Sequence, residues 1–121
     1  MALTTKILIS IIAIEHLVIL WVEMFGWETI GKKVFTSFPP DLFKPTRMLA
    51  ANQGLYNGFL SAGLIWSLFI TDAIWQNNVA LFFLGCVIIA GIYGALTSSK
   101  KIFFVQALPA FIAFAAVLLI R

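Results

Sequence analysis

Long apolar stretches alternate with short polar ones along the chain. Four apolar stretches, at residues 3–25, 48–70, 79–97 and 102–120, come close to the length of about 20 residues that a transmembrane helix needs. The second and third stretches are joined by "TDAIWQNN" and the last two by "SSKK", and helices with such short links are usually antiparallel neighbours. The pattern therefore predicts an all-α integral membrane four-helix bundle that forms a single domain over residues 1–121.

The first connection, residues 26–47, is longer than the other two. It contains "SFPPDLFKPT", with three of the four prolines, so it cannot be one regular helix. Its first part, "GWETIGKKVFTSF", is amphipathic. We expect a short interfacial helix in this part of the connection.

Small residues and a proline inside the apolar stretches predict how the helices pack. Gly54, Gly58 and Ser61 occupy one arc of the second stretch, opposite its polar residues, and small residues let membrane helices approach closely. Pro109 lies one helical turn after Gln106 in the fourth stretch. We expect a kink there that frees a backbone carbonyl, which membrane helices tolerate.

The composition agrees with a membrane environment. Hydrophobic residues make up 62% of the chain and charged residues 11%, whereas a soluble domain carries about 25% charged residues. The net charge of +3 gives no argument for nucleic acid as a partner, because the basic residues lie in short loops between apolar runs. We expect a multi-pass protein of the inner or plasma membrane, with the lipid bilayer as its main partner.

The basic residues also predict an orientation. Two connections, which lie on the same side of a four-span chain, contain Lys32, Lys33, Lys44, Arg47, Lys100 and Lys101. The opposite side has Lys6 and Arg121. Because cytoplasmic loops carry an excess of Lys and Arg, we predict that both termini are extracytoplasmic.

Polar residues inside the four stretches gather at similar depth. His16 and Asn57 fall near the midplane, and others lie roughly 8–12 Å toward the basic loops at 1.5 Å per helical residue. His16 and Glu23 point within roughly 20° of each other. We call the whole set the polar cluster: Glu15, His16, Glu23, Asn52, Gln53, Tyr56, Asn57, Tyr93 and Gln106.

The carboxylates favour a functional interpretation of the polar cluster. A charged side chain near the bilayer centre costs about 2.5–3.5 kcal/mol, and intramembrane ionisable residues are functional candidates by default. The amides alone fit interhelical hydrogen bonds equally well. Glu15 and His16 could instead form a neutral pair that locks helices, and Glu23 could be solvated or paired with Arg47. Glu15 and His16 point about 100° apart, so no metal site is predicted, and the sequence leaves any cofactor unknown.

Four phrases together resemble a known family: "AIEHLVILWVEMF", "AANQGLYNGFLSAGLIW", "FLGCVIIAGIYGA" and "KIFFVQALPA". They are similar to the small bacterial membrane proteins of domain-of-unknown-function family 1304, over essentially the whole chain. The resemblance implies a four-span integral membrane protein and transfers no reaction, ligand or catalytic residue. A more distant likeness to DoxX-like four-helix membrane proteins rests on architecture, and fold does not imply function.

Three classes of function follow from the polar cluster. The first is a pocket open to the cytoplasm that binds a small, partly polar molecule or a lipid headgroup, because clefts with a few convergent polar groups are typical binding sites. The second is a membrane enzyme that transfers protons through Glu15, His16 and Tyr93. The third is a small transporter that works as a homodimer. A purely structural membrane protein is the alternative to all three.

Overall fold

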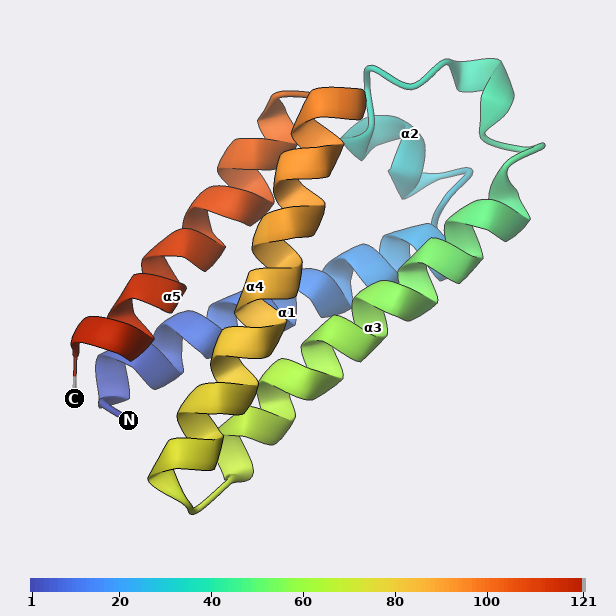
Figure 1. Cartoon of the computed structure of the whole chain (residues 1–121). Coiled ribbons are helices and arrows are strands. Elements are labelled where there is room, and N and C mark those ends of the chain that lie inside the picture. The colour runs from blue at the N-terminus through green and yellow to red at the C-terminus, as the bar shows by residue number, and fades with distance from the viewer. Residues whose placement is uncertain (121) are drawn as a thin grey trace. The chain divides into compact units, whose positions relative to one another are not determined.

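The chain is all-helical in a computed structural model that describes residues 1–120, with no strand among them (Figure 1). The elements are α1 (Leu3–Phe25), α2 (Ile30–Val34), η1 (Pro40–Leu42), α3 (Arg47–Phe69), α4 (Ala73–Thr97), η2 (Phe103–Ala107) and α5 (Leu108–Leu119). The all-α class is confirmed, as is a short helix, α2, in the first connection. Arg121, which entered the orientation argument, lies outside the described residues.

The helix limits follow the apolar stretches closely except at α4. This helix starts at Ala73 instead of residue 79, because Asp72 caps it: the Asp72 side chain accepts a hydrogen bond of 2.9 Å from the backbone N–H of Trp75. The polar residues after Asp72 therefore belong to the helix and not to a loop.

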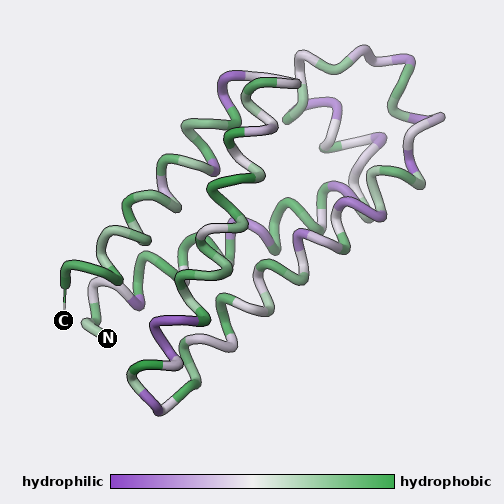
Figure 2. Tube along the Cα trace, viewed as in Figure 1, coloured by the Kyte–Doolittle hydropathy of each residue, from purple (hydrophilic) through white to green (hydrophobic). Residues whose placement is uncertain are grey.

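Two of the described helices, α1 and α4, are long and apolar enough to cross a membrane. The helical segment Phe103–Leu119 is apolar but shorter. Figure 2 shows hydrophobic residues along most of α1, α4 and α5, whereas hydrophilic residues are frequent in the connection between α1 and α3. Four spans remain a prediction.

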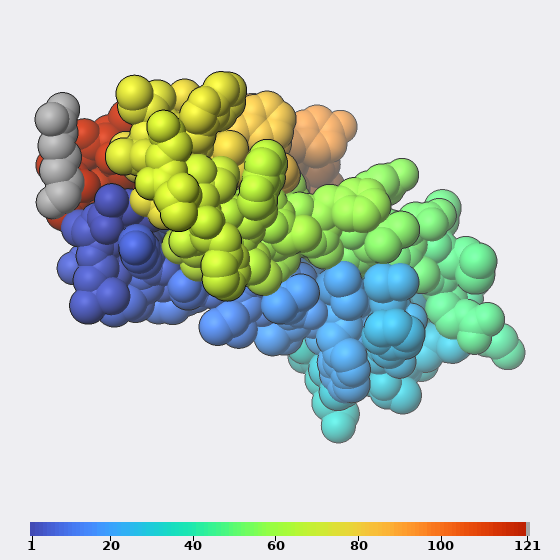
Figure 3. All heavy atoms as spheres, turned by 90° about the horizontal axis from the view of Figure 1, so that it is seen from below, coloured from blue at the N-terminus to red at the C-terminus, as the bar shows by residue number. Residues whose placement is uncertain are grey.

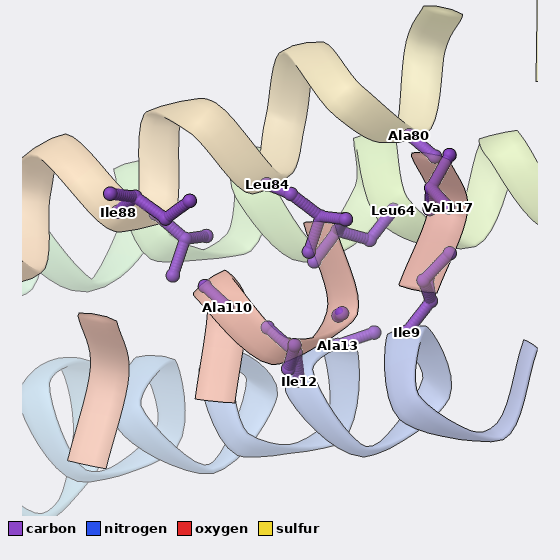
Figure 4. Close-up of a cluster of buried hydrophobic side chains, with 11 residues drawn as sticks. Ile9, Ile12, Ala13, Leu64, Ala80, Leu84, Ile88, Ala110 and Val117 are labelled. Atoms are coloured by element: carbon purple, nitrogen blue, oxygen red, sulfur yellow. The ribbon is translucent and has the colours of Figure 1, made fainter. Parts of the chain in front are cut away.

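The chain divides into two compact units, and the first is formed by Met1–Ile14 and Leu60–Arg121. Its core combines side chains from α1, α3, α4 and α5 that point toward one another (Figure 4). The core residues are Ile9, Ile12, Ala13, Leu64, Ala80, Leu84, Val87, Ile88, Ala110, Ala113 and Val117. Alanines spaced three apart give α5 a narrow face, which lets it pack closely on its neighbours.

Two buried polar side chains of the first unit donate hydrogen bonds to helix backbone carbonyls. The Ser61 hydroxyl donates to the Ala13 carbonyl at 2.8 Å. Ser61 is one of the small residues predicted to let helices approach closely, and its hydrogen bond also joins α3 to α1. The buried Gln76 donates from Nε2 to the Ser67 carbonyl at 3.2 Å. Both bonds satisfy groups that neither water nor lipid would reach.

The segment before Pro109 departs from α-helical geometry as a π turn, whereas the predicted kink with a freed carbonyl stays a prediction. Residues Phe103–Ala107 form a π turn, and the N–H of Leu108 donates to the Phe103 carbonyl five residues earlier. A proline has no N–H and its ring crowds the carbonyl four residues before it. The wider turn accommodates this crowding, and local π adjustment is a known solution in membrane helices.

The second unit is Glu15–Phe59, in which the end of α1 and the start of α3 lie side by side (Figures 1 and 3). A Cβ at Gly54 would lie 3.1 Å from the Leu20 carbonyl oxygen and 3.0 Å from Cβ of Glu23, so glycine is what permits this approach. The prediction that the glycines mark a helix contact within the chain is confirmed.

The first connection folds around Trp27 and Phe43. The two ring centroids are 4.8 Å apart, and Phe35 and Phe38 also lie against Trp27. The indole N–H donates to the Thr46 hydroxyl at 3.0 Å. Despite its three prolines, the connection is therefore an ordered part of the second unit.

Candidate functional site

Glu23 and Asn57 form the centre of the candidate site. Glu23 on α1 is only 3% exposed, and its Oε1 accepts a hydrogen bond of 2.6 Å from Nδ2 of Asn57 on α3. The same amide donates to the Gln53 carbonyl one turn earlier, at 3.2 Å. Because Gly54 lets α3 approach Cβ of Glu23, the amide reaches the carboxylate directly.

This geometry corrects two interpretations. The glycines and the polar residues of α3 were expected on opposite sides of the helix, but Gly54 and Asn57 both face α1. Glu23 is neither solvated nor paired with Arg47: it is buried and bonded to Asn57, whereas Arg47 lies 4.0 Å from Glu28. The missing side chain of Gly54 and the amide of Asn57, one turn later, thus together accommodate the Glu23 carboxyl group.

Glu15 and His16 lie about two turns before Glu23 on α1. His16 is 1% exposed. Glu15 is half-buried, and its Oε1 is a buried atom that accepts no hydrogen bond from any described residue. A buried acceptor without a donor costs on the order of 1–3 kcal/mol, so this oxygen marks a place where a donor group would be stabilised.

The remaining members of the polar cluster are placed less uniformly. Asn52, Gln53 and Tyr56 are exposed on α3, and the Tyr56 ring lies against Phe59. Tyr93 is exposed and Gln106 half-buried, and both belong to the first unit, Gln106 within the π turn. The structure brings Glu23 and Asn57 together; that all nine residues share one site remains a prediction.

Three buried polar residues among residues 1–120 were missed from the sequence: Thr5, Ser67 and Gln76. Gln76 was assigned to a loop, although Asp72, three residues before Trp75, was a helix-start signal that would have placed it on α4. Thr5 is fully buried, and its hydroxyl has no hydrogen-bond partner among the described residues. Its position in an apolar run gave no sign of this.

Among residues 1–120, no three His, Cys, Asp or Glu side chains come close enough to hold a metal ion. An open hollow of about 380 Å³ lies in the second unit where α1 ends and α3 begins. It is lined in part by Glu28 and Arg47 and by no member of the polar cluster.

Comparison with known proteins gives a family and a relative. Residues 10–118 match the family described as "Protein of unknown function (DUF1304)". The chain is similar to the uncharacterized protein YpaA of Lactococcus lactis subsp. lactis (strain IL1403), with 33% identity over 108 residues, which cover 88% of this chain and 89% of the relative. No solved structure matches.

Proposed function

Because this chain belongs to the DUF1304 family of proteins of unknown function, we propose a function from its own chemistry. The protein is an integral inner or plasma membrane protein with four spans. The members of its polar cluster on α1 and α3, which all belong to the second unit, bind a small, partly polar molecule that enters from the cytoplasmic side. Two helices long and apolar enough to cross a membrane support the location.

One observation carries the binding proposal: the buried Oε1 of Glu15, for which the described residues supply no donor. Burial of an acceptor without a hydrogen bond is unfavourable, and membrane packing gives no reason to keep a carboxyl there. A ligand with an N–H or O–H donor would satisfy it. Glu23 lies further along the same helix and, with Asn57 of α3, would orient a second polar group of the ligand.

A structural function is the second candidate, favoured by the 2.6 Å bond between Asn57 and Glu23. That bond joins α1 to α3 without any ligand. A protein whose polar cluster only holds helices together would lose stability when either partner is removed, and would lose no ligand.

Replacement of Glu15 by Gln separates the two candidates. Gln keeps the shape and one acceptor, so we expect an unchanged or higher melting temperature in detergent, because a charge leaves the membrane interior. We expect the content of co-purified small molecule, measured by native mass spectrometry, to fall about ten- to a hundredfold, as for loss of a hydrogen bond to a charged group.

Asp41→Asn is the matched control, since it removes a negative charge from an exposed residue outside both the polar cluster and the hollow. We expect it to leave the ligand content unchanged, and His16→Ala to lower it. A lower melting temperature for Glu15→Gln with unchanged ligand content would end the binding proposal and leave the structural one.

A further inference from the structure

The hollow at the end of α1 has an apolar wall. Its wall is formed by Met24, Phe25, Met48 and Ala51. Phe25 and Met48 are each 71% exposed, although both are large apolar residues. An exposed apolar wall around a hollow of about 380 Å³ is typical of a surface that contacts another apolar group.

Arg47 gives the same hollow a positive charge. Its side chain is 64% exposed, and the 4.0 Å between Nη1 of Arg47 and Oε2 of Glu28 is too long for a hydrogen bond. Exposed ion pairs of this kind contribute little. The guanidinium therefore keeps donors for a ligand, and its planar fork matches the oxygens of a phosphate.

The rest of the connection adds to the positive charge. Residues 26–47 contain four basic residues, Lys32, Lys33, Lys44 and Arg47, against two acidic ones. The three lysines are exposed. An anion that approaches Arg47 therefore meets a positive field from the whole connection.

The backbone next to Arg47 is ordered before any ligand binds. The preceding residue, Thr46, accepts the indole N–H of Trp27 at 3.0 Å and donates to the Leu42 carbonyl at 2.7 Å. Trp27 in turn packs on Phe43, which is 1% exposed. A site that is already ordered loses less entropy when it binds.

We infer that this hollow binds the headgroup of an anionic phospholipid. Arg47 contacts the phosphate, and the apolar wall contacts the glycerol and the first part of the acyl chains. A phospholipid combines both chemistries in one molecule, and α1, whose end forms the hollow, is long and apolar enough to reach the headgroup layer. The inference rests on the membrane location proposed above, and concerns a site outside the polar cluster.

Binding is tested by titration of phosphatidylglycerol and phosphatidylcholine into the detergent-solubilised full chain, with lipid adducts counted by native mass spectrometry. We expect preferential binding of phosphatidylglycerol. Arg47→Gln should lower that affinity about fivefold, the effect of one basic residue near an anionic lipid. Ala51→Phe should lower it as well, because it fills the hollow and leaves every charge in place.

Lys100→Gln is the matched control, because it removes an exposed positive charge from the other basic connection. Equal loss in Lys100→Gln, or no loss in Arg47→Gln, would overturn the inference. Glycerol 3-phosphate has no acyl chains. If it competed for the site as well as phosphatidylglycerol does, the site would bind free phosphate esters, and the assignment to a phospholipid would be overturned. Extraction of membranes with carbonate tests the membrane location separately, so the two failures are distinguishable.

Discussion

At the scale of single residues, the pairing of Glu23 with Asn57 joins α1 to α3 inside the second unit. A carboxyl group that is 3% exposed has exchanged water for an amide donor on another helix. The distance of 2.6 Å between the amide nitrogen and the carboxyl oxygen is short for a hydrogen bond with a nitrogen donor. Removal of the amide is costly chiefly because it leaves the carboxyl buried and without that donor.

We therefore predict that Asn57→Ala destabilises the protein by about 1–3 kcal/mol, the cost of an unsatisfied buried group. Asn52→Ala is the matched control, because Asn52 is an exposed amide on the same helix. It should change the free energy of unfolding by less than about 0.5 kcal/mol. Equal losses in detergent melts of the two variants would contradict the importance of the Glu23 bond.

The residues of the candidate site were predictable only in part from the sequence. Periodicity and depth placed Glu23 and Asn57 in one group, because an apolar helix makes its rare polar residues conspicuous. The sequence pattern could not show that Asn57 faces α1, whereas the side chains of three other polar residues of α3 are exposed: Asn52, Gln53 and Tyr56. That depends on the rotation of α3, which is set by the fit of Gly54 against Leu20 and Glu23.

At the scale of elements, the close contact between α4 and η2 depends on one glycine. A Cβ at Gly91 would lie 2.7 Å from the backbone N of Ala107 and 2.9 Å from its Cβ. Backbone atoms cannot move aside as the end of a flexible side chain can. The π turn before Pro109 therefore lies against a part of α4 that has no room for a side chain.

We predict that Gly91→Ala destabilises the protein by about 1–3 kcal/mol, the usual cost of overpacking. Gly85, on the same helix, has nothing within 4 Å of an added Cβ. Gly85→Ala should be neutral or stabilising by up to about 1 kcal/mol, since alanine favours a helix. Thermal unfolding of both variants in one detergent compares them, and equal stability would refute the close contact.

The helices themselves were largely predictable because their limits follow the lengths of the apolar runs. The limits of α1 and α3 lie within one residue of the prediction. The start of α4 could not be predicted from hydropathy, because it depends on a helix cap at Asp72. The π turn was foreseeable only as a disturbance near Pro109, since its form depends on how Gly91 and Ala107 meet.

At the scale of the whole molecule, charge and apolarity are distributed in one consistent way. The hydrophilic residues of the first connection gather in a folded segment that contains Trp27, Phe43 and four basic residues. Only α1 and α4 are apolar enough to cross a membrane by length and composition among the described helices. The amides of α3 reduce its hydropathy, and one of them, Asn57, bonds to Glu23.

The distribution of charge predicts that both basic connections are cytoplasmic and both termini extracytoplasmic. Short loops that are rich in Lys and Arg stay on the cytoplasmic side of the membrane, and this sets the orientation of multi-span proteins. A reporter that is active only outside the cytoplasm, fused after Arg121, should therefore be active, and the same reporter fused after Lys100 should be inactive. A fluorescent protein that folds only in the cytoplasm should give the reverse result at both positions.

This comparison separates orientation from the number of spans. Activity of the external reporter at Lys100 and not at Arg121 would reverse the orientation while keeping four spans. The same activity at both positions would mean that the segment Phe103–Leu119, which is apolar but short, does not cross the membrane. Because a π turn shifts the alignment of this segment and leaves its apolar residues in place, we expect it to cross.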